Sequence, residues 1–155
     1  AAIWQLVRDT GVLDENSAYA SLLVAEHFAA TSVVAEAEAA GAVIGFISAY
    51  CPPTRDDTVF VWQVGVAEAG RGRGLATRML VDIVNRDACT DVHFLDTTIG
   101  PSNEASMALF RGFARRMGAE VVESELFTAG HFPPHGVHEP EILFRIGPFT
   151  RRAAN

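Results

Sequence analysis

The stretch GVAEAGRGRGLATRML, from Gly65 to Leu80, constrains the fold of this chain more than any other part of its sequence. An apolar run typical of a buried strand leads into the stretch, and an amphipathic helical pattern leads out of it. Three glycines and two arginines lie between them, within residues 70–74. Glycine is costly unless the backbone must bend sharply or approach another group closely. The stretch therefore predicts a strand, a tight loop that holds a ligand, and a helix.

A loop in this position is suited to binding phosphate. The first N–H groups of a helix have no partner inside the helix, and the helix dipole favours an anion at that end. Glycines at positions 70, 72 and 74 allow the backbone to come close, and Arg71 and Arg73 add guanidinium groups that match phosphate oxygens. A plain strand-to-helix turn with solvated arginines is the simpler alternative.

Two other phosphate-binding motifs fit this loop less well. All 12 basic residues are arginine, so there is no P-loop lysine and no lysine to form a Schiff base or act as a base. A dinucleotide-binding loop needs a third glycine where Thr77 stands, although Asp96 lies near the position of a ribose-binding acid. A dinucleotide-binding loop also follows the first strand of its sheet. Here three predicted strands precede the strand that leads into the glycine–arginine loop.

The remaining pattern predicts an α/β protein with a mixed sheet. Asn16 or Ser17 is suited to cap the first helix, Ser102 or Asn103 the last, and Gly118 to end it. Residues 32–37 and 42–50 flank a small turn at Ala40–Gly41 and predict a hairpin, which begins the sheet antiparallel. The later strand–helix–strand unit adds a right-handed parallel crossover. Strands are predicted at residues 3–9, 32–37, 42–50, 59–67, 92–99, 119–127 and 140–149, and helices at 16–29, 75–86 and 101–119.

Composition and charge narrow the class of protein. The chain has 155 residues, of which 49% are hydrophobic and 20% charged, and we expect one globular domain over residues 1–155. The absence of a signal-peptide pattern and of a long apolar run predicts a cytoplasmic protein without a membrane partner. A net charge of −7 disfavours nucleic acid and suits a small cationic substrate. Cys51 and Cys89 have no metal-binding or redox spacing and are expected to be buried thiols.

The pattern R-x-x-G-x-A, formed by Arg71, Gly74 and Ala76, resembles the pyrophosphate loop of the GNAT superfamily of N-acetyltransferases. The order of predicted elements resembles that fold, which has a mixed, mostly antiparallel sheet flanked by helices and splayed at its central strands. The resemblance implies that acetyl-CoA is a co-substrate. Its pyrophosphate would lie on Arg71, Gly72, Arg73, Gly74, Leu75 and Ala76.

The same resemblance places the pantetheine arm of acetyl-CoA along the strand before the loop, like an added strand. It implies that the backbone of Val64 and Val66 pairs with that arm. Gly65, in the middle of the strand, is expected to mark a bulge or close approach where the sheet splays open. A backbone N–H there is expected to polarise the thioester carbonyl.

A second stretch, PSNEASMALFRGFARRMGA, resembles the superfamily's motif N-x-x-A/S-x-x-L-Y. Asn103, Ser106 and Leu109 match the motif. The resemblance implies that Asn103 and Ser106 help to bind the pantetheine arm of acetyl-CoA. Phe110 stands where the superfamily often has a tyrosine that protonates the leaving thiolate. Since phenylalanine carries no such proton, another donor is expected.

The flanking segments WQLVRDTGVLDENSAYASLLVAEHFA, FVWQVGV, TIGPSNEAS and HEPEILFRIG, with the two prolines after GFISAY, resemble the diaminobutyrate acetyltransferases of ectoine biosynthesis over nearly the whole chain. The resemblance implies transfer of an acetyl group from acetyl-CoA to the 4-amino group of L-2,4-diaminobutyrate, by a homodimer. An acetyltransferase for another small diamine or amino acid and a non-catalytic acyl-CoA-binding module are the alternatives. In this family the substrate-binding positions correspond to Asp14, Tyr19, Trp62, His138 and Glu141.

Four of these five residues also have a simpler interpretation. Asp14 could simply end a loop, and Glu141 could be a solvated acid at a strand edge. Tyr19 and Trp62 could be aromatic residues of the core. For catalysis, Glu141 or Asp14 is expected to serve as the base, with His138 as a further candidate and Tyr19 as a proton donor. His131, His135 and His138 lie in a segment rich in proline and glycine without a nearby cysteine, and no metal is expected.

Overall fold

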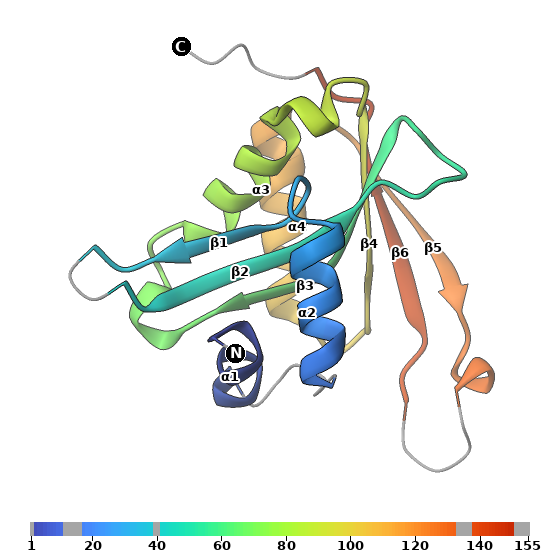
Figure 1. The fold of residues 1–155 in the computed structure, drawn as a ribbon. Helices are drawn as coiled ribbons and strands as arrows, with labels where there is room; N and C mark the ends of the chain where they lie inside the picture. The colour runs from blue at the N-terminus through green and yellow to red at the C-terminus, as the bar shows by residue number, and fades with distance from the viewer. Residues whose placement is uncertain (1, 11–16, 39–40, 133–137, 151–155) are drawn as a thin grey trace.

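The computed structural model describes residues 2–10, 17–38, 41–132 and 138–150 (Figure 1). Its six strands form one sheet in the order β1-β2-β3-β4-β6-β5, and three short 3-10 helices interrupt the connections. None of the helices in these ranges has the length and apolarity to cross a membrane. The elements are α1 (Ala2–Thr10), α2 (Ala18–His27), β1 (Val33–Glu36), β2 (Val43–Tyr50), β3 (Thr58–Val66), η1 (Glu68–Gly70), α3 (Leu75–Asn85), η2 (Asp87–Cys89), β4 (Phe94–Ile99), α4 (Glu104–Met117), β5 (Val121–Phe127), η3 (Ala129–His131) and β6 (Glu141–Ile146).

The topology confirms the predicted mixed, mostly antiparallel sheet. Only β3 and β4 pair in parallel, through the crossover helix α3, and the other neighbouring strands are antiparallel. The hairpin of β1 and β2 forms as expected, with Gly41 at a φ of 60° in its turn. Its neighbour Ala40 lies outside the described residues. The long apolar strand β3 lies in the middle of the sheet, as its continuous hydrophobicity predicted.

The prediction of a strand over residues 3–9 is wrong, because these residues form helix α1. Ile3, Leu6 and Val7 recur at the spacing of one helical face, and they pack with Phe46 as a small separate core. In a run this short, the strand interpretation failed because neighbouring Leu6 and Val7 both enter the core, which alternation across a sheet does not allow.

Helices α3 and α4 cover one face of the sheet, and α1 and α2 lie over the other (Figure 1). The apolar spacing of the sequence predicts a stripe of Leu75, Met79, Leu80, Ile83 and Val84 on α3, and all five are buried. On α4 the i, i+4 spacing predicts a stripe of Ala105, Leu109, Phe113 and Met117. Phe113 is buried and Leu109 and Met117 are half-buried against the core, but Ala105 is exposed, and Phe110 and Ala114 are buried as well.

The predicted caps form where the sequence placed them. The Oδ1 atom of Asn103 accepts the Ser106 N–H at 3.0 Å at the start of α4, and Gly118 adopts a φ of 66° at its end. Ser17 Oγ accepts the Ala20 N–H at 3.2 Å at the start of α2, whereas the other candidate cap, Asn16, is outside the described part of the chain. These hydrogen bonds satisfy groups that the helix ends leave without intrahelical partners.

The sheet splays open between β3 and β4, as predicted. The two strands pair only from Thr58 with Phe94 to Val61 with Thr97. Beyond that point β3 continues to Val66 beside β2, while β4 turns away with β6 and β5. Figure 1 shows the two groups of strands diverging, so the sheet has a closed end, where β4 begins, and an open end.

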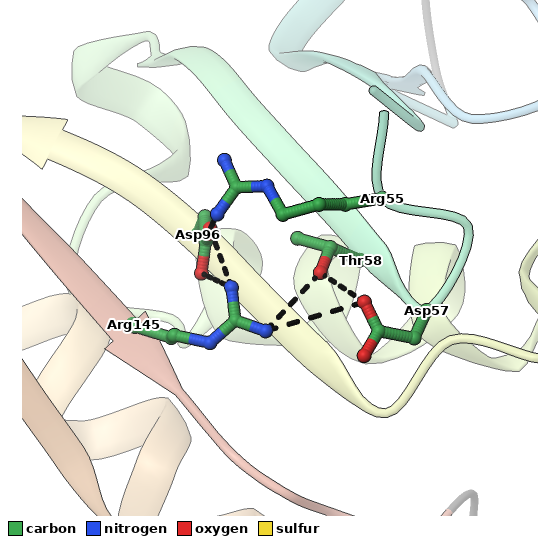
Figure 2. A network of polar contacts seen from close by, with 5 residues as sticks. All are labelled: Arg55, Asp57, Thr58, Asp96 and Arg145. Atoms are coloured by element: carbon green, nitrogen blue, oxygen red, sulfur yellow. Dashed lines mark hydrogen bonds and ion pairs between the residues drawn. The ribbon is translucent and has the colours of Figure 1, made fainter. Parts of the chain in front are cut away.

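A buried ion-pair network lies beside the closed end (Figure 2). The carboxylate of Asp96 is 0% exposed, and Arg55 Nη1 and Arg145 Nη1 donate to its Oδ2 atom at 2.8 and 3.0 Å. Arg145 Nη2 also lies 3.5 Å from Thr58 Oγ1, which donates to Asp57 Oδ1 at 2.7 Å. The network therefore joins β4, β6 and the loop before β3, and it excludes Asp96 as a ribose-binding acid.

Burial raises the pKa of the Asp96 carboxyl above its ordinary value, and the guanidinium groups of Arg145 and Arg55 offset part of that rise. A carboxyl whose pKa is raised by folding binds its proton more tightly in the folded state. Its contribution to the free energy of unfolding is therefore complete below the ordinary carboxyl pKa and is lost as the pH rises through the raised value.

We expect the wild-type protein to gain stability relative to the variant Asp96→Asn as the pH falls from neutral to mildly acidic, because asparagine cannot titrate. Urea unfolding of both proteins across this range measures the difference in free energy. Asp82→Asn is the matched control, since it removes an exposed carboxylate that pairs with Arg86 at 2.7 Å. A wild-type advantage that shrinks toward acidic pH contradicts the prediction.

Candidate active site

The glycine–arginine loop connects β3 to α3 at the open end of the sheet, and its backbone conformation requires glycine at two positions. Gly72 and Gly74 have φ values of 70° and 68°, which residues with a Cβ rarely adopt. A Cβ at either position would meet open space within 4 Å, so both glycines face an unfilled surface. Gly70 differs, because it is buried against Leu75 and Val66. The glycines therefore shape the backbone and leave one side of it accessible.

The start of α3 presents donors to that accessible side. Gly74 is the N-cap and offers no side chain. Among the hydrogen bonds of the described residues, none has a backbone N–H between residues 72 and 77 as its donor. Arg71 and Arg73 are exposed beside these groups. Unpaired N–H groups, the positive end of the helix dipole and two guanidinium groups together suit a pyrophosphate.

The edge of β3 that β4 leaves unpaired offers a second run of backbone groups. Ala67 N–H donates to the Ile44 carbonyl of β2 at 2.9 Å. In an antiparallel ladder only alternate residues bond to the neighbouring strand, so the residues one and three before Ala67 direct their N–H and C=O groups away from β2. Val64 and Val66 are in those positions. The Val66 carbonyl accepts Arg71 Nε at 3.3 Å, as expected of a group that β2 does not use. An extended arm of a ligand can therefore add to β3 as a strand.

Gly65 does not mark the bulge in β3. The register shift lies opposite Ser48 and Ala49, where Gln63 and Val61 are consecutive partners, so Trp62 is the extra residue. Gly65 is small for another reason, because a Cβ there would overlap the ring of Phe46 on β2. The close approach predicted at Gly65 is therefore to a side chain of the protein itself.

The N-terminus of α4 also lies at the open end, directly after β4. Asn103 uses Oδ1 to cap the helix and accepts the N–H of Ser106, which leaves its amide N–H₂ group for a ligand. Phe110, about two turns further on, is 2% exposed and packs in the main core. The phenylalanine in place of the superfamily's tyrosine is thus a core residue, with no hydroxyl to offer a leaving thiolate.

Two of the predicted acceptor residues lie on the same face of the sheet, on opposite sides of the opening. Trp62 follows the last residue of β3 that pairs with β4, is 43% exposed, and lines a cavity of about 270 Å³ beneath α2. Glu141 begins β6, four residues before Arg145, so alternation puts both side chains on one face. Arg145 contacts Asp96 on this face, and α1 and α2 lie over its other half.

The structure shows fewer contacts for the other predicted acceptor residues, Tyr19, His138 and Asp14. Tyr19 is 68% exposed near the start of α2, which excludes the core-aromatic alternative for this residue. His138 is exposed and stacks on Phe132, with 4.8 Å between ring centroids. Asp14 lies outside the described residues. Among the described residues, Tyr19, His138 and Glu141 share no hydrogen bond or ion pair, so their assembly into one site stays a prediction.

Glu139 is a residue at this end that the sequence did not single out. Its Oε2 atom accepts the Ser102 N–H at 3.0 Å, and a Cβ at Gly100 would meet the same oxygen at 2.9 Å. The segment before β6 is thereby held against the connection from β4 to α4. In the sequence, Gly100 of TIGPSNEAS was the available signal for this contact, since glycine often marks a close approach of two chain segments.

The described residues contain no group of three histidine, cysteine, aspartate or glutamate side chains arranged to hold a metal ion. His131 instead accepts the Thr128 N–H at 2.9 Å through Nδ1 in a local capping arrangement. His135, the middle histidine of the sequence, lies outside the described ranges.

Comparison with known protein families shows which family the chain belongs to. The model of the acetyltransferase (GNAT) family matches residues 2–114, which covers α1 through most of α4. The chain belongs to this family. The GNAT fold predicted from the sequence is therefore confirmed, with the glycine–arginine loop between β3 and α3 and the splayed strands in their expected places.

Curated relatives carry a more specific name. L-2,4-diaminobutyric acid acetyltransferase of Marinococcus halophilus is 48% identical over 97% of this chain and 86% of its own length. The enzymes of the same name from Bordetella parapertussis and Virgibacillus pantothenticus are 49% and 43% identical, covering 97% and 100% of this chain and 80% and 95% of their own. The chain also belongs to this narrower group of GNAT proteins, at that level of identity over nearly its full length.

Solved structures agree. Diaminobutyrate acetyltransferase EctA from Paenibacillus lautus, in complex with L-2,4-diaminobutyric acid and coenzyme A, superposes with a TM-score of 0.91 at 42% identity, covering 99% of this chain and 91% of that one. A chain of the NatC complex bound to Gag peptide and CoA superposes with a TM-score of 0.72 at 18% identity, covering 96% of this chain and 89% of that one. The second match shows the fold alone.

The phosphate-loop geometry predicts that Arg71→Ala and Arg73→Ala each raise the KM for acetyl-CoA, by about tenfold for the loss of one charged hydrogen bond. The KM for the amine should change little, because the arginines do not face the acceptor residues. Steady-state kinetics with each substrate varied in turn measures both constants. Arg116→Ala, an exposed arginine in the last turn of α4, is the control. A rise confined to the amine KM contradicts the phosphate-loop assignment.

Proposed function

We propose that this chain transfers the acetyl group of acetyl-CoA to the 4-amino group of L-2,4-diaminobutyrate, giving N4-acetyl-L-2,4-diaminobutyrate and CoA. The observation that carries the proposal is the likeness to the EctA structure that holds L-2,4-diaminobutyric acid and coenzyme A. The open end of this chain's sheet has the features such a reaction needs, which are a phosphate loop, a free strand edge and acidic and aromatic side chains beside it. The product is the amide from which ectoine biosynthesis continues.

Acetyl-CoA would occupy the backbone-lined part of the site. Its pyrophosphate fits the N–H groups at the start of α3, with Arg71 and Arg73 alongside. Its pantetheine arm would pair with Val64 and Val66, and the amide of Asn103 would donate to it from α4. The unfilled space beside Gly72 and Gly74 is consistent with this arrangement, since a Cβ at either position would have no other neighbour.

Diaminobutyrate would occupy the side-chain-lined part. It carries two ammonium groups and one carboxylate, so it suits a site with Glu141 and Asp14 as anions and Trp62 and Tyr19 as walls. His138 is a candidate donor to the substrate carboxylate. The acidic net charge of −7 favours approach of a cation. Holding the α-amino and carboxylate end away from the thioester would direct the reaction to the 4-amino group.

The chemical step needs an uncharged amine. An alkyl ammonium has an ordinary pKa near 10.4, as in lysine, and a neighbouring carboxylate raises it further. We assign Glu141, directly or through an ordered water, as the base that takes the ammonium proton. The amine nitrogen then attacks the thioester carbonyl carbon, and the developing oxyanion faces the free edge of β3 near Val66. The C–S bond breaks as the amide forms, and the nitrogen releases its second proton to water, which balances the proton that the thiolate receives.

The leaving thiolate must receive a proton from a group other than Phe110. Tyr19 is the candidate side chain, with water as the alternative, because its hydroxyl is exposed near the start of α2. No covalent acyl-enzyme is required. The thiol of Cys89 is buried and that of Cys51 is half-buried at the closed end of the sheet, away from the loop that would hold acetyl-CoA.

A homodimer in the cytoplasm completes the proposal. Exposed apolar side chains on α2 and on the edge strand β5 support association, because water-exposed groups of this kind are often covered by a partner. They include Tyr19, Leu22, Val122, Leu126 and Phe127. Acetyl-CoA is a charged molecule that does not cross a bilayer, which supports a cytoplasmic location, and cell fractionation tests it.

The substrate assignment is tested by thiol release from acetyl-CoA with diaminobutyrate, ornithine, lysine or no amine, followed by identification of the acetylated nitrogen. We expect the highest kcat/KM with diaminobutyrate and acetylation of its 4-amino group. A preference for another amine would favour a different acetyltransferase. Tight CoA binding without thiol release in any reaction would favour the non-catalytic module.

The base assignment predicts that Glu141→Gln lowers kcat with diaminobutyrate by about 10²- to 10⁴-fold, the usual contribution of a general base, and leaves the KM for acetyl-CoA nearly unchanged. Glu139→Gln is the matched control, because this neighbouring carboxylate accepts the Ser102 N–H and has no assigned proton transfer. Equal losses in the two variants, or a wild-type kcat in Glu141→Gln, contradict the assignment.

The dimer is tested by light scattering during size-exclusion chromatography. We expect twice the 16.7 kDa mass of the chain at micromolar concentration. The variant Leu126→Asp, which puts a charge on the exposed apolar edge of β5, is expected to weaken association if that edge is covered. A single-chain mass for the wild type contradicts the proposal.

A further inference from the structure

The chain has two cysteines, and the fold brings them together although they are far apart in sequence. Cys51 directly follows the last residue of β2, and Cys89 ends η2, shortly before β4. The Cys89 side chain lies near enough to the Cys51 thiol to lower its pKa, and both belong to one packed region of the core. Both thiols are reduced, and Cys51 packs against the core cluster that contains Cys89.

The segments that carry the two thiols are fixed to one another independently of this contact. The carbonyl oxygen of Asp57, in the loop that begins at Cys51, accepts the N–H groups of His93 at 2.8 Å and Phe94 at 3.1 Å. Parallel pairing of β3 with β4 starts at the next residue. The end of the loop that begins at Cys51 is therefore fixed to the start of β4, shortly after Cys89, by main-chain hydrogen bonds.

The two thiols differ in access. Cys51 is half-buried, so a small oxidant can reach it, whereas Cys89 is 0% exposed and can react only with a group already inside the fold. Burial raises the pKa of the Cys51 thiol, and the nearby Cys89 side chain offsets part of the rise. Since the thiolate is the reacting form, oxidation is favoured at mildly alkaline pH.

We propose that Cys51 and Cys89 are a modification site, an attacking and a resolving thiol that close to an intramolecular disulfide when a peroxide oxidises the folded protein. The Cys51 thiolate attacks one oxygen of hydrogen peroxide, which forms the sulfenic acid and releases hydroxide. The Cys89 thiol then attacks the Cys51 sulfur, the S–S bond forms, and the sulfenic oxygen leaves as water. Overall two thiols and one peroxide give one disulfide and two waters.

The position of the bridge predicts its effect. It would close the chain between residues 51 and 89, tying the β2–β3 loop to the connection between α3 and β4 at the closed end of the sheet. The loop at residues 70–76 and Asn103 are at the other end. We therefore expect the oxidised form to be more stable to heat and to keep its acetyl-CoA site, and the bridge would spare Cys51 from further, irreversible oxidation.

The test treats the reduced full chain with one equivalent of hydrogen peroxide at mildly alkaline pH and measures intact mass, thiol content and thermal unfolding. We expect a monomeric chain lighter by two hydrogen atoms, no thiol that reacts after denaturation, and a linked peptide pair that contains Cys51 and Cys89. The midpoint of thermal unfolding should rise by roughly 5–10 °C, from closing a loop of this length. Dithiothreitol should reverse all four changes.

The variants Cys51→Ser and Cys89→Ser are matched controls, because serine keeps the size and hydrogen-bonding capacity of each side chain. Neither should show the rise in the unfolding midpoint, and Cys89→Ser should accumulate sulfenic or sulfinic acid on Cys51. Wild-type chains joined by an intermolecular disulfide, or sulfinic acid on Cys51 beside an unreacted Cys89, would overturn the proposal. These readouts do not use acetyl transfer, so they are independent of the proposed function.

Discussion

The contact between β3 and β4 is the constraint on which the rest of the structure depends. These strands pair in parallel over a short stretch and then separate, and the paired stretch is secured by a fully buried carboxylate that two arginines reach from different segments. Without the closed end there would be no fixed angle between the two halves of the sheet. Without the separation, every backbone group of β3 would be satisfied by its neighbours, and the chain would have nowhere to receive an extended ligand.

The two halves of the proposed site follow different physical rules. The proposed donor half consists of main-chain groups, namely the first turn of α3 and the free edge of β3, so its specificity would be for a shape and a charge pattern. The proposed acceptor half consists of side chains of β3 and β6 that stand on one face of the sheet. In such an arrangement the acceptor side chains could change without altering the loop or the fold.

The sequence allowed most of the fold to be predicted, because the informative features were local. The glycine–arginine loop, the apolar stripe of α3 and the caps at Asn103 and Gly118 each lie within a few residues of one another. Residues 3–9 were assigned wrongly because a short apolar run supports either a strand or a helix until its core partner is known. The single domain of residues 1–155 and the roles of the site residues stay predictions.

The features that the sequence could not supply are those that depend on distant partners. The bulge at Trp62 depends on the register of β2, and Glu139 matters because Ser102 of another connection meets it. The Asp96 network needs arginines from two other segments, so its acid resembled a ribose ligand when viewed by position alone. The contact of Cys51 with Cys89 likewise has no local signature, because no spacing of two cysteines encodes a crossing of chain segments.

The all-arginine phosphate loop has a consequence for chemical self-damage. An activated thioester held beside a primary amine will acylate it, and a lysine at either position of the loop would compete with the true acceptor for the acetyl group. Arg71 and Arg73 supply the same positive charge through guanidinium groups that stay protonated and are poor nucleophiles. Because none of these 155 residues is lysine, no side chain among them offers an amine to the acyl donor.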